Sequence, residues 1–277
     1  MDPRCSRAPP QRRPPTRPHD RRRSGLTVHS DSLTWVGHAT VLLELGGVRL
    51  LTDPVLRGRI AHLRRSGAPP AQEVTERIDA VLISHLHLDH FDVPSLRRLD
   101  RDVLVVAPTG AGNRLRRLGF SQVTELAAGE GVDVRGLSVT AVPAHHDGRR
   151  YPVGAPADAL GFVIAGRQTV YFAGDTGVLD EPDRVTARLD VALLPVWGWG
   201  PSLGPGHMDP LAAARFTALL SPRLVVPIHW GTLFPAGIER LRGQALVDPP
   251  REFARHVAQL APAVGVRVLE PGETLRL

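Results

Sequence analysis

Cysteine is almost absent from this chain of 277 residues, and the single one, Cys5, lies close to the N-terminus. An intramolecular disulfide needs two cysteines, so one cannot form. Thiolate metal sites are excluded from the rest of the chain for the same reason. Both absences fit a protein of a reducing compartment, and we expect a cytoplasmic location.

Lysine is missing altogether, so all 34 basic residues are arginines. No apolar run approaches the roughly 18 residues that a membrane span needs. With 42% hydrophobic residues and charges of both signs, the composition is typical of a soluble globular protein. The length suffices for one large domain with a sizeable core.

The net charge of +6 has a local origin. Residues 1–25 contain eight arginines and two acidic residues, whereas residues 26–277 carry equal numbers of basic and acidic side chains. This balance argues against a specific nucleic-acid partner. The segment 1–25 is rich in proline and poor in large apolar residues, so we expect a disordered tail before a single domain over 26–277. Two interpretations of the tail stay open: an inert extension, or a weak contact with anionic lipid or nucleic acid.

Beyond residue 33 the sequence alternates short β-rich runs with Gly and Pro turns and a few helical stretches. Asp209 and Pro210 predict the start of one helix, because the aspartate can accept free N–H groups and proline fits the first turn. Without a clear linker or repeat, the chain is predicted to form one α/β domain. The expected strands are 33–45, 48–53, 79–84, 103–108, 137–144, 159–166, 168–175, 190–197, 223–229 and 266–271. The expected helices are 93–99, 110–118, 181–188, 210–220 and 250–260.

Four of the apolar strands end in side chains that can bind a metal ion. These side chains are, in chain order, His85, His87, Asp89, His90, His145, His146, Asp175 and His229. Strand ends at one edge of a sheet are where α/β folds commonly place their chemistry. A lone histidine there is usually a polar turn residue, but so many in equivalent positions are hard to obtain by chance. We therefore predict a metal site.

The motif HLHLDH, residues 85–90, supplies four of these side chains. Extended geometry would direct His85, His87 and Asp89 to one side and leave His90 to reach a second ion. Imidazole and carboxylate are the ligands of zinc where cysteine is unavailable, and manganese or iron accept the same set.

The motif also matches the HxHxDH signature of the metallo-β-lactamase fold. Six further blocks resemble, in order, the branch that contains N-acyl-phosphatidylethanolamine phospholipase D and ascorbate-phosphate lactonase: TWVGHATVLLE, LLTDP, VPAHH, FAGDTG, GHMDP and PIHWGT. The resemblance runs from about residue 33 to residue 235. It implies an α/β protein with a four-layer αβ/βα sandwich and two metal ions between its sheets.

Carried onto this sequence, the resemblance implies two groups of ligands. The first ion would be held by His85, His87 and His146, the second by Asp89, His90 and His229, and Asp175 would lie between them. The family spacing Pro-Ala-x-His selects His146, and His145 is the fallback. We expect two divalent ions, zinc first, with manganese or iron as alternatives.

The resemblance further implies a metal-dependent hydrolase in which a hydroxide shared by the two ions attacks phosphorus or a carbonyl carbon. Antibiotic-degrading members commonly carry cysteine where this chain has Asp175, so a phosphodiesterase or lactonase fits better. Two divalent ions, two aspartates and hydroxide leave a net positive centre, which favours an anionic small molecule or lipid. A phosphodiester, with phospholipase D-like chemistry, is the first hypothesis. A lactonase or ester hydrolase of a small phosphorylated metabolite is the second, and a nucleic-acid processing nuclease or a non-catalytic binding module is less favoured.

Two residues are candidates for catalytic roles. Asp89 is expected to orient the nucleophile as well as to bind metal. His207 lies just before a helix N-terminus, where an anion is favoured, and it is expected to bind substrate or protonate the leaving oxygen. A homo-oligomer fits this branch.

Other side chains near the motifs have two interpretations each. Asp53 resembles the family position that hydrogen-bonds a ligand histidine, but a turn cap is an equal alternative. His38 is either close to the ligands or substrate, or a buried strand histidine. Trp197 and Trp199, among glycines, either line the substrate pocket or cap the core.

Overall fold

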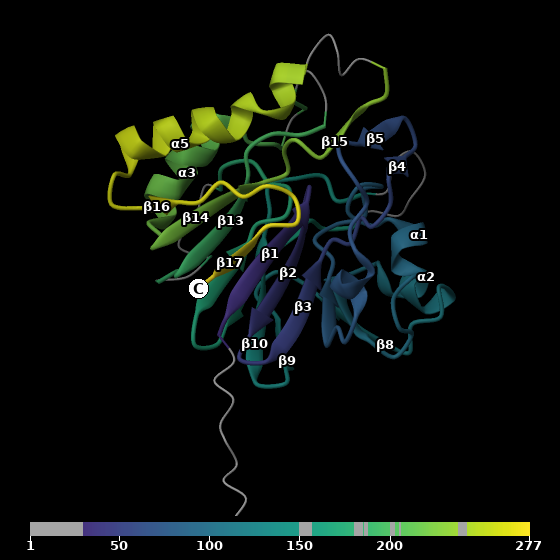
Figure 1. Ribbon diagram of the computed structural model, residues 1–277. Coiled ribbons are helices and arrows are strands. Elements are labelled where there is room, and N and C mark those ends of the chain that lie inside the picture. Colours follow the sequence, from purple (N-terminus) through teal and green to yellow (C-terminus); the bar gives the residue numbers. More distant parts are fainter. Residues whose placement is uncertain are drawn as a thin grey trace, which may run out of the picture.

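The computed structural model describes residues 30–149, 157–179, 185, 188–199, 203–204, 206–237 and 243–277. The predicted tail 1–25 lies outside these residues, and so does nearly all of the predicted helix 181–188. Two large sheets face one another, with helices toward the outside of the molecule (Figure 1).

The first sheet is formed mainly by the N-terminal half of the chain. Its seven strands have the order β17-β1-β2-β3-β6-β7-β8. Neighbours are antiparallel from β17 to β3 and parallel from β3 to β8. The strands are β1 (Ser32–Gly37), β2 (Thr40–Leu45), β3 (Val48–Thr52), β6 (Ala80–Leu82), β7 (Leu104–Pro108), β8 (Gln122–Leu126) and β17 (Thr274–Arg276).

The second sheet also has seven strands, in the order β16-β14-β13-β12-β11-β10-β9. Its pairs are antiparallel from β9 to β12 and parallel from β12 to β16. The strands are β9 (Gly131–Val134), β10 (Leu137–Pro143), β11 (Leu160–Ala165), β12 (Thr169–Phe172), β13 (Val191–Pro195), β14 (Leu224–Ile228) and β16 (Gly265–Val266). A small third sheet contains β4 (Arg59–Ile60), β5 (Leu63–Arg65) and β15 (Leu233–Pro235).

The helices lie outside the sheets. They are α1 (Val93–Leu96), α2 (Gly112–Arg117), α3 (Pro210–Leu220) and α5 (Asp248–Leu260), with short 3-10 turns η1 (Gln72–Thr75) and η3 (Gly243–Leu246).

Two apolar clusters define the layers. The larger one lies between the sheets, where Leu43 of the first sheet and Phe162 of the second are fully buried, and it extends to Phe216 of α3 and Phe253 of α5. The smaller one packs α1 and α2 on the outer side of the first sheet. The layers follow the predicted αβ/βα order.

Local sequence explains these elements. In β10, Leu137, Val139 and Ala141 are buried while Ser138 between them is exposed, as expected for a strand with one face on the core. Helix α3 starts as predicted, with the Asp209 carboxylate accepting the N–H of Ala212 at 2.7 Å.

Two predicted strands differ in the structure. The run 33–45 forms two strands, because the chain reverses at Gly37 and His38, whose φ angles are 120° and 55°. In the run 266–271 only Val266 is in a strand, because the chain leaves the second sheet there and turns toward β17 of the first. The helices predicted at 93–99, 110–118, 210–220 and 250–260 form close to these positions.

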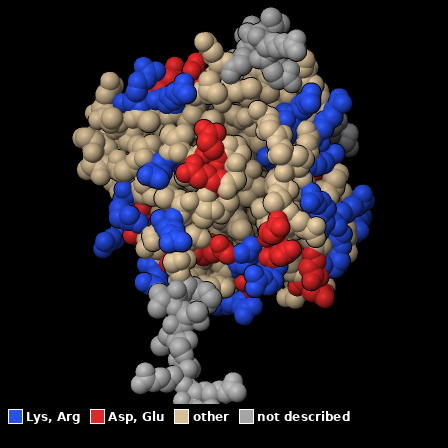
Figure 2. Space-filling view, in the orientation of Figure 1, with Lys and Arg blue, Asp and Glu red and all other residues tan. Residues whose placement is uncertain are grey.

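Charges of both signs share the surface. Figure 2 shows acidic side chains among the arginines on one face, with more arginines toward the side that carries α1 and α2. Arg135 pairs with Asp79 at 2.7 Å, and Arg116 pairs with Glu125 at 3.4 Å. Such exposed pairs contribute little to stability, about 0–1 kcal/mol each.

Candidate metal centre

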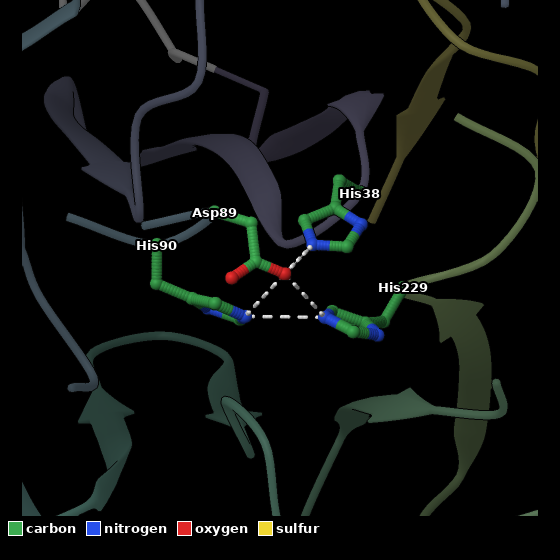
Figure 3. A group of neighbouring side chains, drawn as sticks. All are labelled: His38, Asp89, His90 and His229. Atoms are coloured by element: carbon green, nitrogen blue, oxygen red, sulfur yellow. Dashed lines mark hydrogen bonds and ion pairs between the residues drawn. The ribbon is translucent and has the colours of Figure 1, made fainter. Parts of the chain in front are cut away.

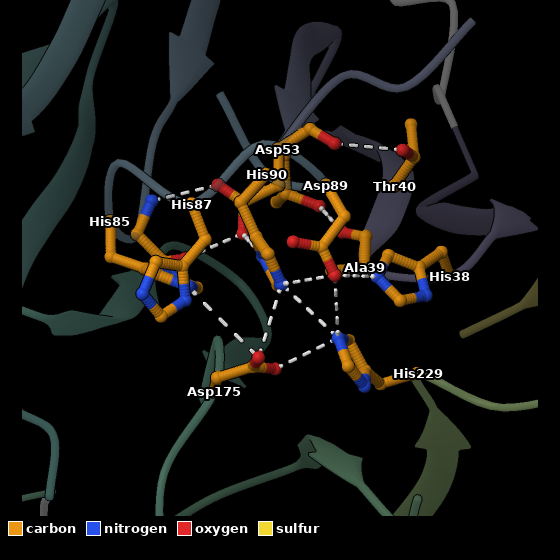
Figure 4. Close-up of polar contacts among 12 residues, drawn as sticks. His38, Ala39, Thr40, Asp53, His85, His87, Asp89, His90, Asp175 and His229 are labelled. Atoms are coloured by element: carbon orange, nitrogen blue, oxygen red, sulfur yellow. Dashed lines mark hydrogen bonds and ion pairs between the residues drawn. The ribbon is translucent and has the colours of Figure 1, made fainter. Parts of the chain in front are cut away.

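The predicted ligands meet between the two sheets, at the edge where the apolar strands end. The HLHLDH motif follows β6, and His146 follows β10. Asp175 follows β12, and His229 follows β14. Rigid strands of both sheets therefore place these side chains close together. Figure 4 labels all of the predicted ligands except His146.

The extended geometry predicted for HLHLDH is wrong. Residues 87–90 form a turn, in which the backbone N–H groups of His90 and Phe91 donate to the carbonyl of His87 at 3.1 and 2.8 Å. Strand β6 ends at Leu82, and Asp92 caps helix α1 immediately after the motif, so the chain has to turn. The turn separates Asp89 from His87 and places it beside other ligands.

The first group of ligand atoms belongs to His85, His87 and His146, and these atoms lie within 4.8 Å of one another. Nε2 of His146 is 3.1 Å from Nδ1 of His87. His145 is exposed, and its backbone N–H donates to Thr176 Oγ1 at 2.9 Å. The geometry therefore favours His146 over His145.

The second group contains His38, Asp89, His90 and His229, again within 4.8 Å of one another (Figure 3). Nε2 of His90 and Nε2 of His229 are 3.1 Å apart. Asp89 Oδ2 is 3.9 Å from each of these nitrogens and 2.9 Å from Nε2 of His38.

Asp175 lies between the groups and is 2% exposed. Its Oδ2 is 3.2 Å from His90 Nε2 and 4.0 Å from His85 Nε2, and its Oδ1 is 3.1 Å from His229 Nε2. The carboxylate also reaches His207, whose Nε2 is 3.3 Å from Oδ2. Asp175 thus occupies the position expected of a shared ligand.

Acceptors behind the rings fix which nitrogen of each histidine faces the centre. Nδ1 of His90 lies 2.7 Å from Asp53 Oδ2, and Nδ1 of His229 lies 2.8 Å from the backbone oxygen of Trp197. Ionised carboxylates and carbonyls only accept hydrogen bonds, so both Nδ1 atoms carry hydrogen. In the neutral rings each Nε2 then has a lone pair. Two lone pairs 3.1 Å apart repel each other unless a proton or a metal ion lies between them.

The first group has the same arrangement. Nδ1 of His146 faces the backbone oxygen of Gly206 at 3.0 Å. Nδ1 of His85 faces Ser84 Oγ at 2.9 Å, and that hydroxyl itself donates to Asp53. The Nε2 lone pairs of both histidines are thereby left for a metal ion.

Two buried atoms supply the test of whether a metal fits. Among the described residues, His85 Nε2 and Asp175 Oδ1 have no hydrogen-bond partner although they are buried. Unsatisfied buried polar atoms are rare and costly. A divalent cation would satisfy a lone pair and a carboxylate oxygen together, so the residues fit a metal ion.

The charge states agree with ligation. Burial lowers the pKa of His85 well below 6.5, so this ring is neutral. Burial raises the pKa of Asp175, but the neighbouring His229 and His90 outweigh it and hold that pKa well below the usual range. Burial also disfavours protonated His90, yet the nearby carboxylates, Asp175 foremost, raise its pKa well above 6.5. In the absence of metal the site therefore attracts a proton, and it would attract a divalent cation more strongly.

The structure shows where Asp53, Trp197 and Trp199 lie relative to the predicted ligands. Asp53 is fully buried and accepts from Ser84 N–H at 2.7 Å as well as from His90, so it orients a predicted ligand. Trp197 packs against the core and offers its carbonyl to His229. Trp199 is 36% exposed and makes a T-shaped contact with the His62 ring, with centroids 5.1 Å apart.

Sequence reasoning missed two contributors, the backbone carbonyls of Trp197 and Gly206. Both accept hydrogen bonds through the main chain, which leaves no mark on residue type.

Comparison with known proteins agrees with this geometry. The β-lactamase superfamily domain matches residues 48–230. A UPF0173 metal-dependent hydrolase of Methanopyrus kandleri is 33% identical over 259 residues, 87% of this chain and 98% of that protein. The N-acyl-phosphatidylethanolamine-hydrolyzing phospholipase D 1 of Caenorhabditis elegans is 30% identical over 239 residues, 76% of this chain and 67% of that protein. The solved structure of Igni18, a metallo hydrolase of Ignicoccus hospitalis, is similar with a TM-score of 0.69 at 29% identity, covering 90% of this chain and 99% of that one.

The chain belongs to the β-lactamase superfamily and is a metal-dependent hydrolase with the metallo-β-lactamase fold. The predicted fold class and enzyme class are confirmed. No helix in the described part of the chain is long and apolar enough to cross a membrane.

Proposed function

We propose that the chain is a dinuclear hydrolase that cleaves phosphodiesters. The observation that carries the proposal is the position of Asp175, whose carboxylate faces nitrogens of both ligand groups, His85 in one and His90 and His229 in the other. One carboxylate shared by two sets of ligands suits a pair of ions. Imidazole and carboxylate ligands fit zinc best, with manganese or iron as alternatives.

Divalent ions bound there would supply Lewis acidity, which makes water a usable nucleophile at neutral pH and offsets charge on the attacked group. The protein supplies the groups that orient water and transfer a proton. Asp89 is part of the second group of ligands, where its carboxylate can orient a water molecule.

His207 is the candidate proton donor. Burial lowers its pKa, but the hydrogen bond to Asp175 outweighs burial and raises the pKa above 6.5. The ring is partly exposed and stands 4.8 Å, centroid to centroid, from the ring of His146. A protonated His207 can therefore give the leaving oxygen its proton.

Two arguments support a phosphodiester. The chain is similar over 76% of its length to a phospholipase D of Caenorhabditis elegans. Two divalent ions against the carboxylates of Asp89 and Asp175 also leave a positive centre, which favours an anionic group at the bond to be cleaved. A cytoplasmic location, an anionic small-molecule or lipid substrate and a homo-oligomeric state are parts of the same proposal.

Hydrolysis of bis(p-nitrophenyl) phosphate by metal-loaded protein tests the proposal. We expect turnover that stops with a chelator and in Asp175→Ala. The matched control is Glu76→Ala, which removes an exposed carboxylate that makes no hydrogen bond or ion pair in the described structure, and it should retain full activity. Two bound ions per chain without turnover would contradict the phosphodiester and favour the lactonase hypothesis. Phosphorylated lactones would then be assayed.

A further inference from the structure

The turn between β1 and β2 connects the two sheets beside the metal centre. Its residue His38 accepts a hydrogen bond at its carbonyl from His229 N–H, 2.9 Å, and another from Trp35 Nε1, 2.9 Å. Its own N–H donates to Thr232 Oγ1 at 2.8 Å. The turn of the first sheet is thereby joined to the loop that follows β14 of the second sheet and carries His229.

The side chain of His38 continues this connection. The ring is 1% exposed and lies against the His229 ring, with centroids 3.8 Å apart. Its Nε2 is 2.9 Å from Asp89 Oδ2, as Figure 3 shows. Within the described structure this is the only hydrogen bond to the Asp89 carboxylate.

The direction of this hydrogen bond separates His38 from the neighbouring histidines. Ionised Asp89 can only accept, so the hydrogen lies on Nε2 of His38. In His90 and His229, by contrast, Nδ1 donates to an acceptor behind the ring, which leaves Nε2 facing the centre for a metal ion. His38 therefore cannot use Nε2 as a ligand atom while it holds Asp89.

We propose that His38 is a positioning residue that orients the Asp89 carboxylate toward His90 and His229. Four of the predicted ligand histidines have such a partner: Ser84 for His85, Asp53 for His90, the Gly206 carbonyl for His146 and the Trp197 carbonyl for His229. His38 does the same for Asp89, and it acts from the opposite sheet to His229. The inference rests on the proposed dinuclear site and adds a residue to it.

A matched pair of variants isolates the donor. His38→Gln can place an amide N–H close to the position of Nε2, whereas His38→Leu has similar bulk and no donor. Both substitute at φ 55°, so both bear the same kind of backbone strain. Asparagine tolerates this φ but is too short to reach Asp89, so His38→Asn supplies a folded variant without the hydrogen bond if leucine unfolds the protein.

The first readout is independent of activity. Titration with Co²⁺ against a competing chelator gives the affinity of each site, and the visible spectrum of the Co²⁺ protein reports ligand geometry. We expect His38→Leu and His38→Asn to weaken one of the two ions about 10- to 100-fold and to alter the spectrum. His38→Gln should stay within about threefold of wild type, with the wild-type spectrum, because it keeps the donor.

The second readout is turnover of bis(p-nitrophenyl) phosphate. In His38→Leu we expect kcat to fall about 10- to 100-fold with little change in KM, and in His38→Gln we expect substantial recovery of kcat. Equal affinities and spectra in the leucine and glutamine variants would overturn the proposal, because the donor would then be irrelevant. Loss of one ion in both the leucine and the glutamine variant would also overturn it, because His38 would then be a metal ligand and not a positioning residue. If wild type binds two ions without turnover, the phosphodiester assignment fails, and the Co²⁺ comparison still decides the role of His38.

Discussion

Asp53→Asn is the substitution whose effect follows most directly from the hydrogen bonds of the site. Asp53 is fully buried and accepts from Ser84 N–H, Ser84 Oγ and His90 Nδ1. Asparagine has nearly the same shape but presents one N–H₂ in place of an acceptor. If that group faces His90, the hydrogen of the imidazole moves to Nε2, the atom that faces the metal centre.

The magnitude can be estimated from this change of tautomer. Loss of a carboxylate behind a ligand histidine typically lowers metal affinity or activity about 10- to 100-fold. This loss corresponds to about 1.4–2.7 kcal/mol of binding free energy. If asparagine turns its oxygen toward His90, its N–H₂ instead faces the N–H of Ser84. Two donors then oppose each other, and the folded protein loses stability.

Chelator competition with Zn²⁺ on purified wild type and Asp53→Asn measures the affinity, and urea unfolding of the metal-free proteins measures stability. Asp79→Asn is the matched control, because Asp79 also accepts from a backbone N–H, that of Arg49 at 2.9 Å, but is not among the ligand clusters. We expect wild-type affinity in the control. Wild-type affinity and wild-type stability in Asp53→Asn would refute the reasoning.

Three further predictions follow from the same structure. His207→Gln should lower kcat about 10²- to 10⁴-fold on phosphodiesters with alkyl leaving groups. It should hardly change kcat on p-nitrophenyl esters, because p-nitrophenolate leaves without a proton. Equal losses on both kinds of substrate would contradict the role of His207 as the acid. Gly174→Ala should destabilise the fold by about 1–3 kcal/mol in urea unfolding, because its φ is 61° and a Cβ would lie 2.6 Å from Ser84 Cβ; an unchanged midpoint would contradict this. Removing Zn²⁺ that is present at 100 times its Kd should lower the free energy of unfolding of the wild type by about 2.7 kcal/mol, or its Tm by roughly 5–10 °C. In Asp175→Ala the same removal should lower the Tm by less. An unchanged wild-type Tm would contradict the metal site.

The sequence predicted much of the fold and the location of the site for a physical reason. Buried strands need continuous apolar runs, so their ends are visible as the point where polar residues begin. His146, Asp175 and His229 each lie just beyond such an end, and the structure brings them together.

The remainder depended on features without a local signature. The turn at residues 87–90 depends on the helix cap at Asp92 and on the hydrogen bond between His90 and Asp53, two residues 37 positions apart. The reversal at His38 requires a positive φ in a run that otherwise has the composition of a buried strand. Strands of two or three residues, such as β4 and β5, are too short for any period to show.

The central claim is that Asp175 holds two ions together. Electron paramagnetic resonance of the protein loaded with Mn²⁺ tests it directly, because two ions that share a carboxylate are magnetically coupled. We predict two Mn²⁺ per wild-type chain with the spectrum of a coupled pair, and an uncoupled spectrum in Asp175→Ala. A single ion per wild-type chain, or two ions with the spectrum of isolated Mn²⁺, would contradict it.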